Sequence, residues 1–158
     1  MNVFLKSIFL LIICINNLRA EISFNVEVDE FTDEKVEYIF DSTGSSIEIE
    51  KSLERVKSSW LYVACSDNLC MLSLHNYYDD WNELGTSDAY VILDGEKWNN
   101  HEFRLETDIG SDDSESYGYI YQKEVFKKLL NSKVFRSKVG NLVYSIDLTK
   151  LPISKFSF

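Results

Sequence analysis

The sequence predicts a mainly β protein, either an antiparallel β-sandwich or a partly closed barrel, with one α-helix packed on one side. Several short segments alternate apolar and polar residues, which is the two-residue period of a half-buried strand. Aromatic residues make up 14% of the chain, mostly as ten Phe and nine Tyr, and such residues favour strands. Only residues 123–131 show a convincing helical period, with apolar Val125, Phe126, Leu129 and Leu130 on one face. A length of 158 residues leaves room for a single domain.

Residues 1–20 are expected to be a signal peptide rather than part of the fold. A short segment ending in Lys6 precedes an apolar stretch over residues 7–15, and a polar exit ends at the small residue Ala20. This three-part layout is typical of a secretory signal cleaved after Ala20. A lipoprotein site at Cys14, a retained anchor and a buried strand stay as alternatives. The apolar stretch is shorter than a spanning helix requires, so we expect a periplasmic or secreted protein without stable membrane insertion after cleavage.

The remaining residues, 21–158, are expected to form one β-rich domain. Its first half contains two strands and a hairpin, with an ambiguous segment between them that has features of both a strand and a short helical turn. The hairpin prediction depends on two apolar runs that flank the polar turn Ser66–Leu69. The strands are expected over residues 22–28, 36–40, 60–65 and 70–75, and the ambiguous segment over residues 47–57.

The second half is expected to contain further short strands around the single helix. Asp94-Gly95 is a common tight-turn pair. Residues 76–86 are expected to form a polar and aromatic loop, and residues 108–116 an acidic loop. The strands are expected over residues 88–93, 102–106, 117–121, 133–138 and 142–148.

The two cysteines of the mature chain, Cys65 and Cys70, flank the predicted hairpin turn. Four intervening residues allow the flanking positions to face each other, which brings two Cα atoms within disulfide range. An exported protein meets an oxidising compartment, and this favours a disulfide. A pair of free buried thiols is the alternative. The spacing is not that of a C-x-x-C redox motif.

No residue pattern indicates an enzyme, a cofactor or a metal site. His75 and His101 are the only histidines, no nucleophile elbow accompanies them, and we expect both to be ordinary polar positions. The acidic residues Asp108, Asp112, Asp113 and Glu115 suggest calcium, but they lack the ligand spacing of an EF-hand loop. We therefore expect a solvated acidic loop, no catalytic residues, no cofactor and no metal.

Large aromatic side chains are candidates for a partner contact. Tyr77, Tyr78 and Trp81 lie in a predicted polar loop, where so many rings are not obviously needed for packing. Aromatic residues of this kind are enriched at protein interfaces. Local packing is the alternative. Trp60 opens the most apolar strand and is expected in the core.

The charge of the chain narrows the class of partner. The full chain carries 26 acidic and 16 basic side chains, a net charge of −10. Cleavage after Ala20 would remove Lys6 and Arg19, which leaves a net charge of −12. Nucleic acids and anionic lipids require basic surfaces, so neither is an expected partner. A protein partner is expected, and an acidic protein suits the capture of a basic one.

The order of these features resembles that of small exported β-proteins, including the type VI secretion-associated VasI-like accessory family and its phage and bacterial relatives. The resemblance covers roughly residues 22–153 and depends on structural motifs. These are Phe31–Lys35, Leu61–Cys65, Ala89–Trp98, Val125–Leu130 and Val143–Leu151. It implies an exported accessory protein and no catalytic site.

These observations together predict an exported, non-enzymatic binding or accessory protein of the cell envelope. Association with secretion machinery is what the resemblance adds. The alternative is a periplasmic inhibitor or immunity-type protein that captures a basic toxin or a lysozyme-like enzyme.

Overall fold

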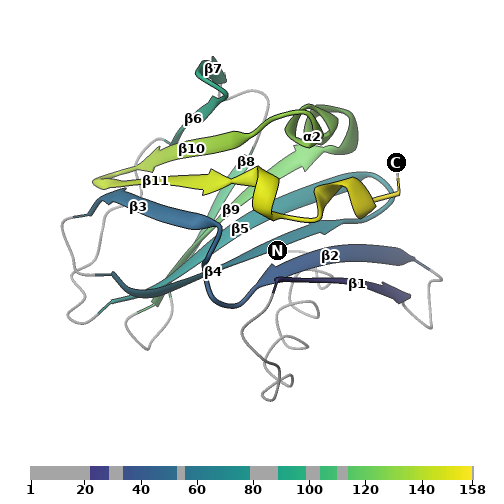
Figure 1. Ribbon diagram of the computed structural model, residues 1–158, viewed down its shortest axis with the longest axis horizontal. Coiled ribbons are helices and arrows are strands. Elements are labelled where there is room, and N and C mark those ends of the chain that lie inside the picture. Colours follow the sequence, from purple (N-terminus) through teal and green to yellow (C-terminus); the bar gives the residue numbers. More distant parts are fainter. Residues whose placement is uncertain are drawn as a thin grey trace.

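The computed structural model shows a sandwich of two antiparallel sheets with one α-helix (Figure 1). It describes residues 22–28, 34–52, 56–78, 89–98, 104–109 and 114–157. Neither sheet closes on itself, so the predicted β-rich fold with one packed helix is confirmed in its sandwich form. The signal peptide, residues 1–20, lies outside the described residues.

The larger sheet has six strands in the order β1-β2-β4-β5-β9-β8. All neighbouring strands pair antiparallel, and β1 and β8 form its two edges. The run of apolar residues in β4 forms a central strand, as its composition predicts. The strands are β1 (Ile22–Val28), β2 (Lys35–Asp41), β4 (Val56–Cys65), β5 (Leu69–Tyr78), β9 (Ser114–Gln122) and β8 (Arg104–Ile109).

The smaller sheet has five strands in the order β3-β11-β10-β6-β7. The ambiguous segment 47–57 resolves into β3 and the start of β4, whereas the short strand β7 is not anticipated by the sequence pattern. The Asp94-Gly95 turn joins β6 to β7, with φ angles of 49° and 91°. The strands are β3 (Ile47–Lys51), β11 (Leu142–Asp147), β10 (Val134–Val139), β6 (Ala89–Leu93) and β7 (Glu96–Trp98).

The helix α2 spans Lys123–Leu130, one residue shorter than predicted, and follows directly on β9. Phe126 and Leu129 point into the protein and are almost completely buried. The Phe126 ring packs against Tyr121 and Phe156 at centroid distances of 6.1 and 6.0 Å. Lys127 and Lys128 occupy the last turn, where the helix dipole favours cations.

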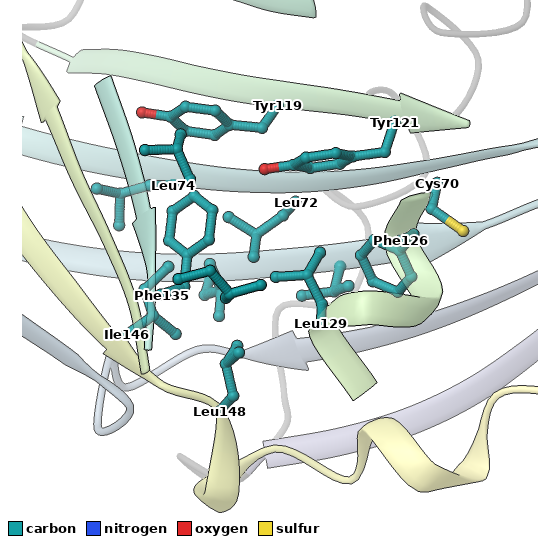
Figure 2. Packing of buried hydrophobic residues seen from close by; sticks show 14 of the residues in the cluster. Cys70, Leu72, Leu74, Tyr119, Tyr121, Phe126, Leu129, Phe135, Ile146 and Leu148 are labelled. Carbon is teal, nitrogen blue, oxygen red and sulfur yellow. The ribbon is translucent and has the colours of Figure 1, made fainter. Parts of the chain in front are cut away.

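The space between the sheets is filled by large apolar and aromatic side chains from both (Figure 2). Phe135 of β10 and Tyr119 of β9 meet there, with ring centroids 5.3 Å apart. The Tyr119 hydroxyl lies 2.6 Å from the Ser137 hydroxyl and accepts a hydrogen bond from Tyr144 at 2.8 Å. Hydrogen bonding of these buried hydroxyls removes much of the cost of placing them in an apolar core.

The C-terminal segment is held against β2 by a buried carboxylate. Two short 3₁₀ helices, Leu148–Lys150 and Ile153–Lys155, lead to Phe156 and Ser157. Glu37 accepts hydrogen bonds from the Ser157 amide at 2.6 Å and from the Lys35 ammonium at 2.6 Å. Burial would raise the pKa of Glu37, but these bonds outweigh burial and lower it. The ionised Glu37 side chain on β2 therefore holds the segment around Ser157 against the larger sheet.

Candidate functional site

The outer face of the six-stranded sheet carries a second apolar cluster, separate from the core. Because side chains alternate between the faces of a strand, every second residue of β2, β4 and β5 points away from the smaller sheet. We call this cluster the outer aromatic face. Its members are the buried Tyr38, Tyr62 and Ala64 and the half-buried Val36, Phe40, Trp60 and Met71.

Contacts across neighbouring strands organise the outer aromatic face. Tyr38 and Tyr62 have ring centroids 5.5 Å apart, and Phe40 packs edge-on against Trp60 at 5.3 Å. Such cross-strand aromatic pairs stabilise a sheet. Trp60, expected in the core, is half-buried and belongs to this outer face instead.

His75 extends the outer aromatic face onto β5. It lies directly opposite Trp60 in the strand register, and the two rings are stacked with centroids 3.5 Å apart. Its Nε2 atom lies 3.0 Å from the hydroxyl of Ser73, two residues earlier on the same strand. Burial lowers the pKa of His75 to about 3, so the imidazole is neutral at physiological pH.

The Ser73–His75 pair has the residue types of a nucleophile and its base, but its environment suits packing better. An imidazole with so low a pKa is a weak general base near neutral pH, because efficient bases have pKa values close to the working pH. Ser73 is itself 2% exposed, which leaves a substrate little access to its hydroxyl. His101 lies outside the described residues.

The three residues predicted to contact a partner do not share one environment. Tyr77 follows His75 by two residues on the same face of β5, so it lies at the border of the outer aromatic face, where it is 40% exposed. Tyr78 is 4% exposed and donates a hydrogen bond to Glu115 at 3.3 Å. The expectation that Tyr78 forms part of a contact surface is therefore wrong, because its side chain alternates to the inner face and is used there. Trp81 lies outside the described residues.

The structure also corrects the two ends of the solvated acidic loop predicted at residues 108–116, since β8 extends to Ile109 and β9 begins at Ser114. Asp108 lies in β8, Glu115 lies in β9, and Asp112 and Asp113 lie outside the described residues. Glu115 is 3% exposed and accepts hydrogen bonds from the hydroxyls of Tyr78 and Tyr117. Burial raises its pKa more than these two bonds lower it, so the net shift is upward. Among the residues that the structure describes, no group of His, Cys, Asp or Glu side chains could hold a metal ion.

We predict that the stability of the Glu115→Gln variant, relative to that of the wild type, increases as the pH rises. A raised pKa in the folded state means that the stability contributed by Glu115 is present below its unfolded pKa and lost as the pH rises through its folded pKa. Glutamine has no such loss, so the difference in unfolding free energy between variant and wild type should shift in favour of the variant from pH 4 to pH 8. Urea unfolding at both pH values measures it. A difference that is independent of pH would contradict the raised pKa.

The predicted hairpin between Cys65 and Cys70 is present, and the two residues are joined in a disulfide. They lie directly opposite each other in the register of β4 and β5, with Cα atoms 4.1 Å apart. The Ser66 amide donates to the Leu69 carbonyl at 2.9 Å and closes the turn between them. Both cysteines are buried on the core side of the sheet.

Replacing both cysteines with serine is expected to destabilise the protein by about 1–2 kcal/mol and to leave the fold intact, since the closed loop is short. Thermal unfolding followed by circular dichroism measures the shift, and reduced wild type should show a similar one. Mass spectrometry of exported protein after alkylation checks the bridge itself. Two alkylated thiols in the native protein would contradict it.

A half-open cavity of about 360 Å³ lies between β3 and the start of β4. Its lining combines apolar Ile47, Ile49 and Val56 with hydroxyl-bearing residues of the adjoining turn and strand. Gly44, at φ 64°, forms part of the wall, and a Cβ atom there would lie 2.4 Å from the Ser59 carbonyl oxygen. The close approach of this turn to β4 therefore requires glycine. Sequence reasoning missed the cavity because the segment 47–57 had no clear periodicity.

Charge is distributed unevenly along the chain. The net charge does not reveal that residues 21–122 are strongly acidic and residues 123–158 are basic. Residues 21–122 carry 24 acidic and 6 basic side chains, a formal charge of −18. Residues 123–158 carry 2 acidic and 8 basic side chains, a formal charge of +6. Every strand of the six-stranded sheet comes from the acidic part, whereas α2, β10 and β11 come from the basic part. The outer aromatic face thus belongs to the strongly acidic part of the protein.

No helix in the described part of the chain is long and apolar enough to cross a membrane. In comparisons with known proteins, the chain matches no family model, no curated protein and no solved structure.

Proposed function

We propose that this chain is an exported, non-enzymatic binding or accessory protein of the cell envelope that holds a protein partner. The observation that carries the proposal is Tyr77, an exposed tyrosine beside the outer aromatic face, on a sheet whose strands all come from the acidic part of the chain. Aromatic side chains provide contact energy at protein interfaces, and complementary charge steers and selects the partner. The resemblance to the VasI-like accessory family extends the proposal to secretion machinery.

The environment of Ser73 and His75 supports a binding role over a catalytic one. Both side chains are buried, and burial lowers the pKa of His75 to about 3. The pair is therefore suited to holding Trp60 in place through the stacked imidazole. We expect the purified protein to show no turnover in a panel of hydrolase assays. Turnover that is lost in His75→Ala would contradict this part of the proposal.

An inhibitor or immunity-type protein is the second candidate, and the charge distribution favours it specifically. A formal charge of −18 over residues 21–122 would attract a basic toxin or lysozyme-like enzyme more strongly than the net charge suggests. This candidate differs from the first in one consequence, because binding would block the activity of the partner.

The experiment is a binding assay of the exported protein against a panel of basic exported enzymes, including a lysozyme, with acidic proteins of similar size as controls. We expect binding to a basic member and at least a tenfold weaker affinity at about 300 mM than at about 50 mM NaCl, since salt screens exposed charges. Inhibition of the bound enzyme identifies the second candidate, and binding without inhibition identifies the first. Equal binding to acidic controls, or binding insensitive to salt, would contradict both.

A further inference from the structure

The four edge strands of the sandwich differ in how they are protected against pairing with another chain. Exposed edges are usually blunted by charge, bulges or shortness, because their unpaired amides and carbonyls otherwise accept a further strand. In the smaller sheet, β7 has only three residues, and β3 has a register irregularity opposite Val143 and Tyr144 of β11. In the larger sheet, β8 carries an ion pair between Arg104 and Glu106 at 2.7 Å.

The remaining edge strand, β1, is neither short nor irregular, and it carries a single charged residue. Its seven residues contain no proline, lysine or arginine, and they pair with β2 in one uninterrupted register. Its single charged residue, Glu27, accepts a hydrogen bond from Tyr38 on β2 at 2.7 Å. No described residue pairs with the other side of the strand. Within the described part of the chain, this side of β1 is therefore an unpaired backbone edge seven residues long.

The side chains of β1 provide an apolar stripe next to that edge. Ile22, Phe24, Val26 and Val28 alternate onto the core side of the sheet. Ile22 and Phe24 are half-buried, and Phe24 packs against Phe156 with ring centroids 5.6 Å apart. Val26 and Val28 are 49% and 57% exposed, the highest values among the large apolar side chains that the structure describes. The stripe is thus half-buried at Ile22 and Phe24 and exposed to solvent at Val26 and Val28.

We propose that β1 pairs antiparallel with β1 of a second copy of this chain, which joins the two six-stranded sheets into one continuous sheet. A two-fold axis through Asn25 is the only symmetric register that pairs all seven residues. In that register Val26 lies opposite Phe24 of the second copy, and Val28 lies opposite Ile22 of the second copy. Each exposed valine is then covered by an apolar partner, and cross-strand pairs of this kind are stabilising.

The same register explains why a second copy fits this edge better than an unrelated strand. On the opposite face, Glu27 lies opposite Ser23 of the second copy, so within the seven residues of β1 no two carboxylates face each other directly across the axis. Like charges directly opposite would be destabilising. The stripe is self-complementary, because the exposed Val26 and Val28 of one copy meet the less exposed Phe24 and Ile22 of the other copy. A closed two-fold dimer uses the same patch on both subunits, which is what this pattern provides.

The first test is the mass in solution, by light scattering, of the protein exported from the full chain. We expect wild type to be a dimer and Val26→Lys to be a monomer, because a charge at the centre of the edge opposes strand addition. Val134→Lys is the matched control, since Val134 is 42% exposed on the interior strand β10 and should leave the dimer intact. Circular dichroism confirms that both variants are folded.

A wild type that is monomeric at all accessible concentrations would overturn the proposal and would leave the β1 edge to a strand of a different protein. A dimer that persists in Val26→Lys would overturn it as well, because the dimer would then use another surface.

The second test fixes the register by oxidative cross-linking. Asn25→Cys places one thiol opposite its own copy across the two-fold axis, so we expect a covalent dimer under mild oxidation. Ser23→Cys is the matched variant on the same face, and its thiols would lie four residues apart, about 13 Å, beyond disulfide range. Cross-linking of Ser23→Cys as fast as that of Asn25→Cys would overturn the proposed register.

Discussion

Replacement of Asp41 by alanine is expected to lower the free energy of unfolding by about 3 kcal/mol, since it leaves the two buried donors of Ser46 and three part-buried donors of Thr43 and Ser45 without their acceptor. Asp41 ends β2, is completely buried and organises the turn that carries the chain into the smaller sheet. One carboxylate oxygen accepts from the amide and hydroxyl of Thr43 at 3.2 and 2.8 Å, and from the Ser45 amide at 3.3 Å. The other accepts from the amide and hydroxyl of Ser46 at 2.8 and 2.7 Å.

The effect of Asp41→Ala should also depend on pH in a defined direction. Burial would raise the pKa of Asp41, but the hydrogen bonds from Ser46, Thr43 and Ser45 outweigh burial and lower it. The stability it contributes is therefore present above its unfolded pKa and lost as the pH falls through its folded pKa. Urea unfolding at pH 7 and pH 3 should show a smaller difference from wild type at pH 3.

Ser42→Ala is the matched control for this turn, because Ser42 is exposed and adjacent to Asp41. It should change the unfolding free energy by less than about 0.5 kcal/mol. Equal effects of the two substitutions would contradict the role assigned to the Asp41 carboxylate.

Phe135→Ala is expected to destabilise the protein by about 3–4 kcal/mol and to lower its melting temperature by roughly 10 °C. Phe135 is fully buried between the sheets, where it packs edge-on against Tyr119 of the larger sheet. Within its own sheet it lies between Leu93 and Ile146, both of which point into the core. Truncation to alanine therefore leaves a cavity whose walls come from both sheets.

Val134→Ala serves as the control for Phe135→Ala, because it shortens the preceding side chain on the exposed face of the same strand. Calorimetric melting should show a shift of no more than a few degrees for Val134→Ala. A shift for Phe135→Ala as small as that for Val134→Ala would contradict the face-to-face packing of the two sheets.

The fold was predictable where local pattern and tertiary environment agree. The alternation in β1 gives the observed bounds, and the apolar run in β4 marks a strand buried on both faces. The Lys123–Leu130 helix is amphipathic, and its apolar side meets the core. In these segments the side-chain period alone specifies which face is buried.

The start of β9 was not predictable, because its local sequence pattern and its tertiary environment disagree. Ser114, Glu115 and Ser116 have the composition of a loop, yet they pair with Tyr77, Asn76 and His75 of β5. Glu115 is tolerated inside because the hydroxyls of Tyr78 and Tyr117 bind it. The residues that pair with this part of β9 and bind Glu115 are brought there by the tertiary structure, so no short-range sequence pattern predicts them.

The outer aromatic face was only partly predictable. Tyr77 was identified from composition, but the stacking of Trp60 on His75 depends on a register between β4 and β5 that the sequence leaves open. Assignment of Tyr78 to the same surface failed because the loop predicted at residues 76–86 begins instead as a continuation of β5. In a strand, neighbouring residues face opposite sides, so Tyr77 and Tyr78 cannot both be on the surface.

The most direct test of the proposed binding surface compares two tyrosines of matched exposure. Tyr77 on the six-stranded sheet is 40% exposed, and Tyr90 on the five-stranded sheet is 41% exposed. Once a basic partner is identified, its dissociation constant should be measured by calorimetry with wild type, Tyr77→Ala and Tyr90→Ala. We predict at least a tenfold loss of affinity for Tyr77→Ala and less than a twofold change for Tyr90→Ala. Full affinity in Tyr77→Ala, or an equal loss in Tyr90→Ala, would contradict a partner site on the outer aromatic face.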